Sequence, residues 1–391
     1  MDAFDVIVVG AGPAGAVAAR DLARRGARVA LVDGSHPREK PCGGGVTSRA
    51  LELAATTGGL AAGHVMTGQI IDAVTFEAGG RSARVGLPHT EYLKVFPREA
   101  FDAALLRQAV DAGATHIPSR VTTVGRTAGR WQIAAGGRSL STSWLLGADG
   151  PAGIVRKQVF RPFERRQLSI AAGSYVEGVE SSEIVIGFID EPCGYLWSFP
   201  RAGHLAVGTC AQANETSAAE MHAITDRWLD QSALANGLTR RRYSWPIPSL
   251  DARDLDAERP AGDGWMLLGD AAGLVDPITR EGIFFALRSG MLAAAALATP
   301  SPERVYADVV RDELHDELRR AARLKAGFYR PRFTRLLIDA LNQSPAIQRV
   351  MLDLVAGRQP YRGLKRRLLG TMEVGLMWSV FRPPTSRYFA R

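Results

Sequence analysis

The N-terminal segment shows two different periods of hydrophobic positions, one after the other. Residues 4–9 form a mostly apolar run rich in valine and isoleucine, which is typical of a buried strand. Residues 17–22 carry apolar side chains at helical spacing, and residues 27–32 return to an apolar run that predicts a second strand. The order strand, helix, strand indicates an α/β domain with parallel strands.

The middle of the chain changes to strict alternation. Aromatic residues recur at every second position of residues 195–199, so a strand here presents all of them on one face of a sheet. A turn is expected at residues 201–203, and residues 205–209 continue the alternation, which predicts a hairpin. Residues 183–189 add another short alternating strand, so we expect an antiparallel sheet in this part of the chain.

The C-terminal third is predicted to be helical. Residues 305–325 combine helical spacing with mixed charge, as expected of a helix that packs on the α/β domain or closes over a pocket. Residues 361–391 place a basic cluster, Lys365 to Arg367, beside apolar and aromatic residues. Such a segment either binds an anionic membrane surface or is a solvated charge cluster beside a packed helix.

Composition narrows the class of protein. The chain has 391 residues, of which 46% are hydrophobic and 23% charged, as in an ordinary globular protein. Its net charge of +8 favours acidic partners, but no nucleic-acid-binding signature accompanies this charge, so nucleic acid is not expected. The most apolar later run, residues 290–298, is less than half as long as the roughly 20 residues that a membrane span requires.

The cysteines and the N-terminus indicate the compartment. Cys42, Cys193 and Cys210 match neither a disulfide framework nor the paired spacing of a metal site. No basic leader precedes the first apolar run, so it does not resemble a secretory signal. We therefore expect a cytoplasmic protein without a metal site.

A glycine turn joins the first strand to the first helix. Gly10 permits a tight turn, Gly12 lets a pyrophosphate approach the backbone, and Gly15 allows the helix and strand to pack closely. The phosphates are expected at the helix N-terminus. Asp33 ends the second strand, eighteen residues after Gly15, where an acidic residue binds the adenosine ribose. This arrangement predicts dinucleotide binding; the alternative is a glycine turn in an unrelated α/β domain.

Two later segments identify the dinucleotide by resemblance. Asp149-Gly150 and Gly269-Asp270 each follow a short apolar strand and precede a helix. With the glycine turn, they resemble the fingerprints of the FAD fold shared by aromatic hydroxylases, flavin halogenases and geranylgeranyl reductases, the para-hydroxybenzoate hydroxylase-like superfamily. The sequence Glu281-Gly282-Ile283, the loop of residues 41–45 and the Tyr-x-Trp-x-Phe-Pro pattern of residues 195–200 are similar to the geranylgeranyl reductase family.

The resemblance implies an α/β fold with a Rossmann-like FAD-binding domain, an inserted substrate domain built on an antiparallel sheet, and C-terminal helices. The expected boundaries are 1–60, 97–160 and 255–297 for the FAD-binding domain, 61–96 and 161–254 for the substrate domain, and 298–391 for the helical region. The residues predicted to bind FAD are Gly10, Gly12, Pro13, Ala14, Gly15, Asp33, Gly34, Cys42, Gly43, Gly44, Gly45, Arg98, Val121, Asp149, Gly150, Gly269, Asp270, Gly282 and Ile283.

Some of these side chains have simpler interpretations. Arg98 is expected to reach the cofactor, or else to be a solvated charge in the first turn of its helix. Asp270 is expected at the ribityl or pyrophosphate part of FAD, or else to cap a helix. Tyr195, Trp197 and Phe199 are predicted to form an aromatic wall for an apolar chain, but a sheet buries such residues in its own core as well.

The family implies reduction of an isoprenoid C=C bond by hydride from reduced flavin, with the protein positioning and shielding the substrate. Cys42 is the candidate proton donor, because a thiol at a helix N-terminus can have a lowered pKa; the alternative is a small packing residue. No second glycine fingerprint appears, so electrons are expected from transient NADPH or another donor. The expected substrate is an apolar small molecule or a lipid, and the protein is expected in the cytoplasm or peripheral to the membrane.

The same fold leaves other functions open. A monooxygenase that hydroxylates a natural product, a halogenase, and a flavoprotein without catalytic activity are the alternatives. Lys94 is a candidate halogenating lysine, although we expect it on a strand of the substrate sheet. Arg280 departs from the glycine that this family commonly places before Glu-Gly-Ile, and it is expected to pair with Glu281 or to meet an anionic substrate group.

Overall fold

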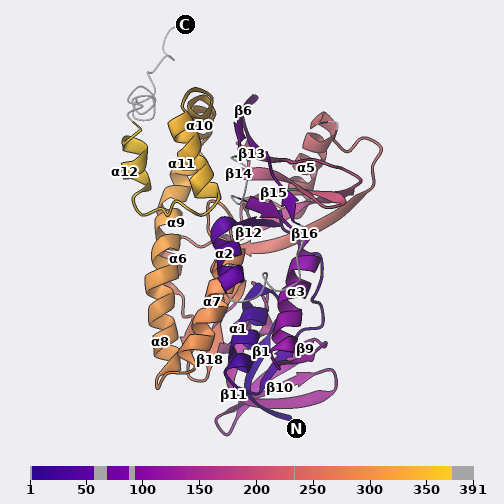
Figure 1. The fold of residues 1–391 in the computed structure, drawn as a ribbon, viewed down its shortest axis with the longest axis vertical. Helices are drawn as coiled ribbons and strands as arrows, with labels where there is room; N and C mark the ends of the chain where they lie inside the picture. Colours follow the sequence, from indigo (N-terminus) through magenta and orange to yellow (C-terminus); the bar gives the residue numbers. More distant parts are fainter. Residues whose placement is uncertain (1, 57–67, 88–92, 233, 372–391) are drawn as a thin grey trace.

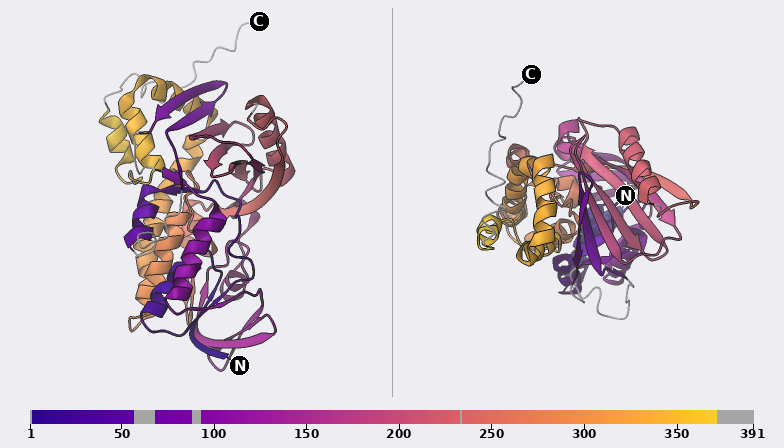
Figure 2. Two further views of the ribbon diagram at one scale, coloured as in Figure 1. Left: turned by 45° about the vertical axis from the view of Figure 1, so that its right-hand side comes forward. Right: turned by 90° about the horizontal axis from the view of Figure 1, so that it is seen from above.

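The computed structural model describes residues 2–56, 68–87, 93–232 and 234–371. Two large sheets lie at opposite ends of an elongated molecule, and the C-terminal helices run along one side of both (Figures 1 and 2). This arrangement confirms the predicted α/β class, with a parallel Rossmann-like sheet, a second antiparallel sheet and C-terminal helices. The predicted domain boundaries stay a prediction.

The first sheet is built around parallel strands near the N-terminus. Its strands are β17 (Ala261–Gly262), β18 (Trp265–Leu267), β11 (Arg138–Gly147), β1 (Asp2–Val9), β2 (Val29–Val32) and β8 (Thr115–Ile117) in spatial order, with β10 (Arg130–Ala135) and β9 (Val121–Thr127) added beside β11. Strands β18, β11, β1, β2 and β8 are parallel. Because β1 and β11 end side by side at Val9 and Gly147, the turns that follow them meet at one edge of the sheet.

Helices α1 (Pro13–Arg24), α3 (Arg98–Asp111) and α7 (Ile283–Ala296) pack together beside this sheet. Helix α1 is buried along most of its length because its small side chains leave room for its neighbours. A Cβ added at Gly290 of α7 would lie 2.4 Å from the carbonyl oxygen of Ala14. The backbone in the middle of α7 is therefore in contact with the first turns of α1, which fixes how the two helices pack.

The second sheet is antiparallel apart from one pair of strands. In spatial order it contains β16 (Arg240–Pro248), β12 (Leu168–Glu177), β15 (His204–Gln212), β14 (Gly194–Arg201), β13 (Glu183–Ile189), β5 (Ala73–Ala78) and β6 (Arg81–Gly86). The predicted hairpin is confirmed, since β14 and β15 pair with Arg201 opposite His204. The predicted strand at residues 183–189 is also confirmed as β13, which is parallel to β5.

A small three-stranded sheet consists of β3 (Gly45–Thr47), β7 (Leu93–Val95) and β4 (Gln69–Ile70), with β7 packed against β14 and β3 against α7. The expectation for Lys94 was wrong in this respect: it lies on β7, opposite Val46, and not in the seven-stranded sheet. The glycine loop leads directly into this small sheet, because β3 begins at Gly45.

The remaining helices connect and cover the sheets. They are α2 (Ser48–Thr56), α4 (Ile154–Val159), α5 (Ala218–Ser232), α6 (Ala252–Ala257), α8 (Pro302–Val309), α9 (Asp316–Phe328), α10 (Pro331–Gln343), α11 (Pro345–Val355) and α12 (Leu364–Leu369), with 3₁₀ turns η1 (Arg165–Gln167) and η2 (Gly269–Ala272) and a π-helical segment η3 (Val310–His315) between α8 and α9. The predicted helix at residues 305–325 is thus confirmed, and α9 leads to the pair α10 and α11 beside the second sheet (Figure 1).

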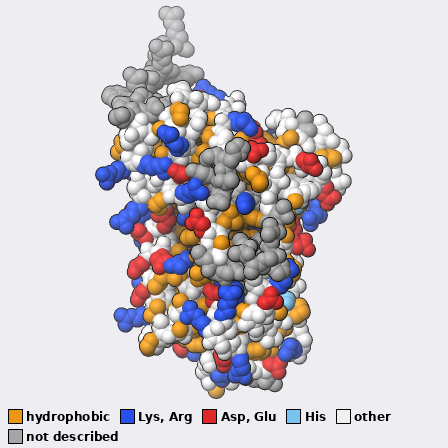
Figure 3. Space-filling model, in the orientation of Figure 1, with side chains coloured by type: hydrophobic (Ala, Val, Ile, Leu, Met, Phe, Trp, Pro, Cys, Tyr) orange, Lys and Arg blue, Asp and Glu red, His pale blue; other side chains and the backbone are white. Residues whose placement is uncertain are grey.

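Positively charged side chains do not form one continuous patch on the face shown in Figure 3. Lys and Arg side chains are interspersed with Asp and Glu over this face, so it offers no continuous basic track for a nucleic-acid backbone. No helix among the described residues combines the length and apolar character that a membrane span requires.

The contact between α1 and α7 gives a first prediction. Gly290→Ala should lower the free energy of unfolding by about 1–3 kcal/mol, because the new methyl group must push the two helices apart. Chemical denaturation measures this change. Gly327→Ala in α9 is the matched control, since nothing lies within 4 Å of its added Cβ; it should be neutral or stabilising by up to about 1 kcal/mol. Equal destabilisation by the two variants would contradict the role of Gly290.

Candidate active site

The glycine turn after β1 exposes the N-terminus of α1. Gly10 has φ of 104°, a conformation that glycine adopts without strain, and a Cβ added there would lie 2.3 Å from the carbonyl oxygen of Ala148. Gly12 is the N-cap residue of α1, and no side chain caps the helix. Pro13 begins the helix, so the free amides and the positive end of its dipole are available to a phosphate. Ala14 and Gly15 follow as buried residues.

Asp33 lies at the end of β2 and organises the same turn. Its carboxylate accepts hydrogen bonds from the Ala11 amide at 2.8 Å and from the Ser35 amide at 2.6 Å, and His36 Nδ1 lies 2.9 Å away. Burial alone would raise the pKa of Asp33, but these hydrogen bonds and the charge of His36 lower it below its usual value. Asp33 is therefore ionised at the place predicted for the ribose.

Gly34 and Val121 do not line the pocket described below. A Cβ at Gly34 would be 2.7 Å from the Arg120 amide nitrogen, so the backbone after β2 passes against the segment that begins β9. Val121 is buried at the start of β9. A contact of either residue with FAD stays a prediction.

A chain of buried charges links Asp33 to α3. His36 Nε2 lies 3.4 Å from Asp102, and Asp102 accepts hydrogen bonds from Arg98 at 2.9–3.1 Å. Burial would lower the pKa of His36, but the two carboxylates raise it. Arg98 is only 3% exposed and lines the pocket. The interpretation of Arg98 as a solvated first-turn charge is therefore wrong.

The loop of residues 40–45 crosses from this cluster to the second sheet. Lys40 Nζ forms an ion pair with Asp270 at 2.9 Å, and Arg201 on β14 donates hydrogen bonds to the Cys42 carbonyl oxygen and, at 3.2 Å, to that of Gly43. A Cβ added at Gly43 or Gly45 would lie 3.1 or 2.9 Å from the ring of Phe199. The glycines thus let the loop backbone lie directly against an aromatic ring.

Cys42 lies in this loop and lines the pocket. Its Sγ accepts a hydrogen bond from the Gly44 amide at 3.3 Å, and Gly44 has φ of 83°. The expectation that the thiol sits at a helix N-terminus was wrong, because the loop continues into strand β3. The thiol lies instead beside the guanidinium of Arg98. Burial would lower the pKa of Arg98, but the neighbouring Asp102 and Cys42 raise it above its usual value.

The third fingerprint forms the opposite wall of the pocket. Gly269 has φ of 54° after β18, and Asp270 follows in η2, where its side chain caps no helix. The helix-cap interpretation of Asp270 is therefore wrong. Gly282 is the N-cap of α7, again without a capping side chain, and Gly282 and Ile283 line the same pocket as Asp270. A second free helix N-terminus thus faces the pocket.

Asp149 and Gly150 lie beneath the first glycine turn and do not line the pocket. A Cβ added at Gly10 would be 2.8 Å from the Asp149 amide nitrogen. The carboxylate of Asp149 accepts a hydrogen bond from the Val155 amide at 3.0 Å, and its burial raises the pKa to about 6. In this structure the pair supports the turn, and a direct contact with FAD stays a prediction.

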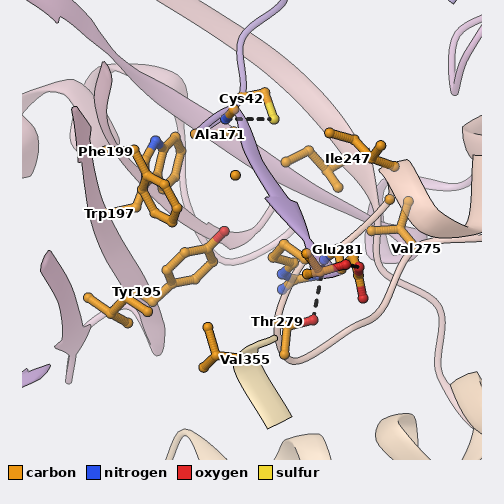
Figure 4. Close-up of a pocket in the computed structure, with 18 of the residues that line it drawn as sticks. Cys42, Ala171, Tyr195, Trp197, Phe199, Ile247, Val275, Thr279, Glu281 and Val355 are labelled. Carbon is orange, nitrogen blue, oxygen red and sulfur yellow. Dashed lines mark hydrogen bonds between the residues drawn. The ribbon is translucent and has the colours of Figure 1, made fainter. Parts of the chain in front are cut away.

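One side of the pocket is aromatic and apolar. Figure 4 shows Tyr195, Trp197 and Phe199 there, with the Tyr195 hydroxyl pointing into the pocket, and the loop that carries Cys42 lies against the Phe199 ring. All three residues come from β14, as the period of two predicts. Trp197 also belongs to a buried cluster with Tyr175 and Tyr243, so the wall is part of the sheet's core as well.

Several lining residues were not found from the sequence. Helix α11 contributes Met351, Leu354 and Val355, and Lys40 lines the pocket beside Asp270. The apolar stripe of residues 345–355 was visible in the sequence, but not the fact that this helix reaches a pocket built by residues far earlier in the chain. The C-terminal helices are thus part of the site.

The N-terminus of α1 at Pro13, the N-terminus of α7 at Gly282 and the glycines of the loop line one pocket, and no side chain caps either helix. Asp33 lies outside this lining and binds the Ala11 amide in the turn that leads into α1. This arrangement suits a dinucleotide with a flat ring. These features define an FAD-dependent oxidoreductase. The chain belongs to the family described as "FAD binding domain", whose model matches residues 3–316.

Named relatives refine this class. The chain is 29% identical over 312 residues to a geranylgeranyl diphosphate reductase of Rhodobacter capsulatus, covering 75% of this chain and 74% of that protein. It is 27% identical over 387 residues to a menaquinone reductase of Mycobacterium tuberculosis, covering 90% and 92%. A geranylgeranyl bacteriochlorophyll reductase-like protein of Thermoplasma acidophilum has the same fold, with a TM-score of 0.77, 20% identity and coverage of 95% and 100%.

The buried histidine gives a prediction about pH. Because the folded-state pKa of His36 is raised, its charge stabilises the fold below the unfolded pKa of about 6.5, and this contribution is lost as pH rises through the folded value. His36→Gln should therefore reduce the free energy of unfolding more at pH 6 than at pH 9, as measured by urea denaturation. His116→Gln is the control, and a His36→Gln effect that is the same at both pH values would contradict the charge network.

Proposed function

We propose that this flavoprotein reduces C=C bonds of a polyprenyl-type substrate. The observation that carries the proposal is the aromatic wall of Tyr195, Trp197 and Phe199, which adjoins the Cys42 loop in a pocket that extends to α11. The names of the geranylgeranyl and menaquinone reductases support the same substrate class, because both names refer to molecules with an isoprenoid chain.

The pocket residues bind and shield the chain. Apolar side chains from two parts of the molecule, Phe188 on β13 and Val355 on α11, line the pocket beside the wall, so an alkyl chain there is removed from water. Burial raises the pKa of Tyr195 well above its usual value, which keeps its pocket-facing hydroxyl protonated and uncharged. The ring faces of the wall can also stabilise positive charge that develops on a substituted carbon.

The reduction requires a hydride and a proton. FAD, when bound and reduced, supplies the hydride. The C=C π bond breaks as one carbon accepts the hydride and the other accepts a proton from Cys42 Sγ, and the thiolate is then reprotonated from solvent. The guanidinium of Arg98 lies beside this thiol. The glycine fingerprint near the N-terminus is assigned to FAD, and the sequence shows no second one that would bind a nicotinamide coenzyme tightly. The electrons therefore come from transiently bound NADPH or from another donor.

Contact with a membrane remains part of the proposal. Lys365 and Arg366 are exposed, and Leu369 is 56% exposed at the end of the described chain, while residues 372–391 of the predicted anchor lie outside the described residues. Tyr361 donates a hydrogen bond to Asp276 at 3.1 Å and is packed, and a truncation after Thr371 retains this contact. The truncated protein in which Lys365 and Arg366 are also replaced by Gln should lose binding to anionic vesicles, and unchanged binding would remove the anchor.

The product of an anaerobic reaction tests the function. Dithionite-reduced holoenzyme incubated with a polyprenyl lipid, a polyprenyl quinone and an aromatic compound should add two hydrogens per double bond to a polyprenyl compound only, as read by mass spectrometry. A hydroxylated aromatic product that requires oxygen would instead indicate a monooxygenase, and a halogenated product would indicate a halogenase. If none of the three compounds changes in mass, the proposed reductase activity is wrong, and a flavoprotein without catalytic activity is favoured.

The proton-donor role of Cys42 gives a separate prediction. Cys42→Ala and Cys42→Ser should lower substrate reduction by about 10²-fold or more, while flavin reduction by the electron donor is unchanged, as stopped-flow spectroscopy can show. Cys193→Ala is the control, because that thiol is exposed and lies outside the pocket. Unchanged substrate turnover in both Cys42 variants would mean that Cys42 is a small packing residue.

A further inference from the structure

Arg280 is held in an unusual conformation at the edge of the pocket. It lies in the loop between η2 and α7, lines the pocket, and has φ of 59°, the left-handed region that favours glycine. It does not pair with Glu281, as the sequence allowed, because that carboxylate accepts hydrogen bonds from Thr47 and Arg49. A strained backbone that presents a cation to a pocket indicates a use for that cation.

A second basic side chain, Lys325, shares a hydrogen-bond acceptor with Arg280. Arg280 donates a hydrogen bond to Ser249 Oγ at 2.6 Å, and Lys325 Nζ donates to the same oxygen at 2.7 Å and to Gln212 Oε1 at 2.7 Å. Ser249 Oγ in turn donates to Gln212 Oε1 at 3.1 Å. Two positively charged side chains therefore converge on one hydroxyl group, and their only hydrogen-bond acceptors in this cluster are neutral.

Negative charge near the pair is distant or already engaged. Asp276 acts on Arg280 only through space, and its Oδ1 accepts hydrogen bonds from the amides of Ile278 and Thr279. Glu215 and Asp251 act on Lys325 in the same indirect way. Within the described ranges, neither cation has a carboxylate oxygen at ion-pair distance. Arg280 Nε is buried and has no hydrogen-bond partner.

The electrostatics of Lys325 agree with a shortage of negative charge. Its burial, followed by the repulsion of Arg280, lowers its pKa to about 7. A buried cation normally has a paired anion, since an uncompensated charge in a low-dielectric environment is costly. An anion bound beside Arg280 would satisfy the free guanidinium nitrogen and favour the charged form of Lys325.

The pair borders the aromatic and apolar part of the pocket. Arg280 lies close to Tyr195 and Tyr329, which stack with ring centroids 6.5 Å apart, and Phe188 and the α11 residues line the same pocket with apolar groups. We propose that Arg280, supported by Lys325 through Ser249, forms an anion subsite that binds a phosphate or diphosphate group at the polar end of the substrate. This proposal rests on the proposed function, and it favours a prenyl diphosphate over an uncharged polyprenyl quinone.

Binding to the FAD-loaded protein tests the subsite without turnover. Isothermal titration calorimetry would compare geranylgeranyl diphosphate, geranylgeraniol and inorganic diphosphate on the unmodified protein, Arg280→Gly, Lys325→Met and the control Arg107→Gln, an exposed arginine of α3. Arg280→Gly removes the cation and relaxes the backbone, and Lys325→Met removes the second charge at similar length. FAD content and the thermal midpoint are recorded for each variant.

The subsite predicts that both variants bind geranylgeranyl diphosphate about 10- to 100-fold more weakly, with unchanged affinity for geranylgeraniol, unchanged FAD content and a thermal midpoint that does not fall. Equal loss of both chain ligands, or no loss of either, would overturn it. Loss of FAD would assign the cations to the cofactor instead. Inorganic diphosphate that binds as tightly as the prenyl diphosphate would indicate a site for a free anion and not for a substrate head group.

The proposed function can fail separately. If neither chain ligand binds the unmodified protein, a polyprenyl substrate is excluded, and inorganic diphosphate alone then decides whether Arg280 and Lys325 bind an anion. If geranylgeraniol binds as well as its diphosphate, the polyprenyl pocket stands and the anion subsite is wrong.

Discussion

The contact between the glycine loop and the ring of Phe199 fixes the relation between the two halves of the site. Because Gly43 and Gly45 have no side chains, the loop that leaves the parallel sheet lies against an aromatic residue of the antiparallel sheet. Arg201 on the same strand holds the loop by its carbonyl oxygens. Residues predicted to bind the cofactor and the aromatic residues of β14 therefore line one pocket, although they come from different sheets.

Buried charges keep the loop in this position. Arg201 pairs with Glu39, and the Glu39 carboxylate also accepts a hydrogen bond from the Arg98 amide at 3.1 Å. A buried ion pair contributes little net stability. Removing one partner leaves the other charge buried without compensation and lowers the free energy of unfolding by about 3–5 kcal/mol. These pairs thus enforce one arrangement of the loop. Arg280 and Lys325 differ because their charges are not matched within the described protein, and we attribute that difference to a ligand.

Local patterns in the sequence predicted local structure well. The glycine turn, the strand of residues 183–189 and the hairpin at residues 201–203 depend on neighbours in sequence, so period and turn residues were sufficient. Contacts over long separations were not predictable in this way. Arg49 pairs with Glu281 across 232 positions, a contact that a single sequence does not reveal. Because Glu281 is engaged in this way, it does not form an ion pair with the adjacent Arg280. The loop's continuation into β3 likewise depends on pairing with β7, so Cys42 was misplaced at a helix.

The central claim is that the pocket brings an alkene to reduced flavin. Anaerobic stopped-flow absorbance at the flavin band, with the reduced holoenzyme mixed against a polyprenyl substrate, measures this step most directly. The account predicts that the flavin is reoxidised without oxygen, at a rate that rises with substrate concentration. Reoxidation that occurs only after oxygen is admitted, whether or not the polyprenyl compound is present, would contradict it.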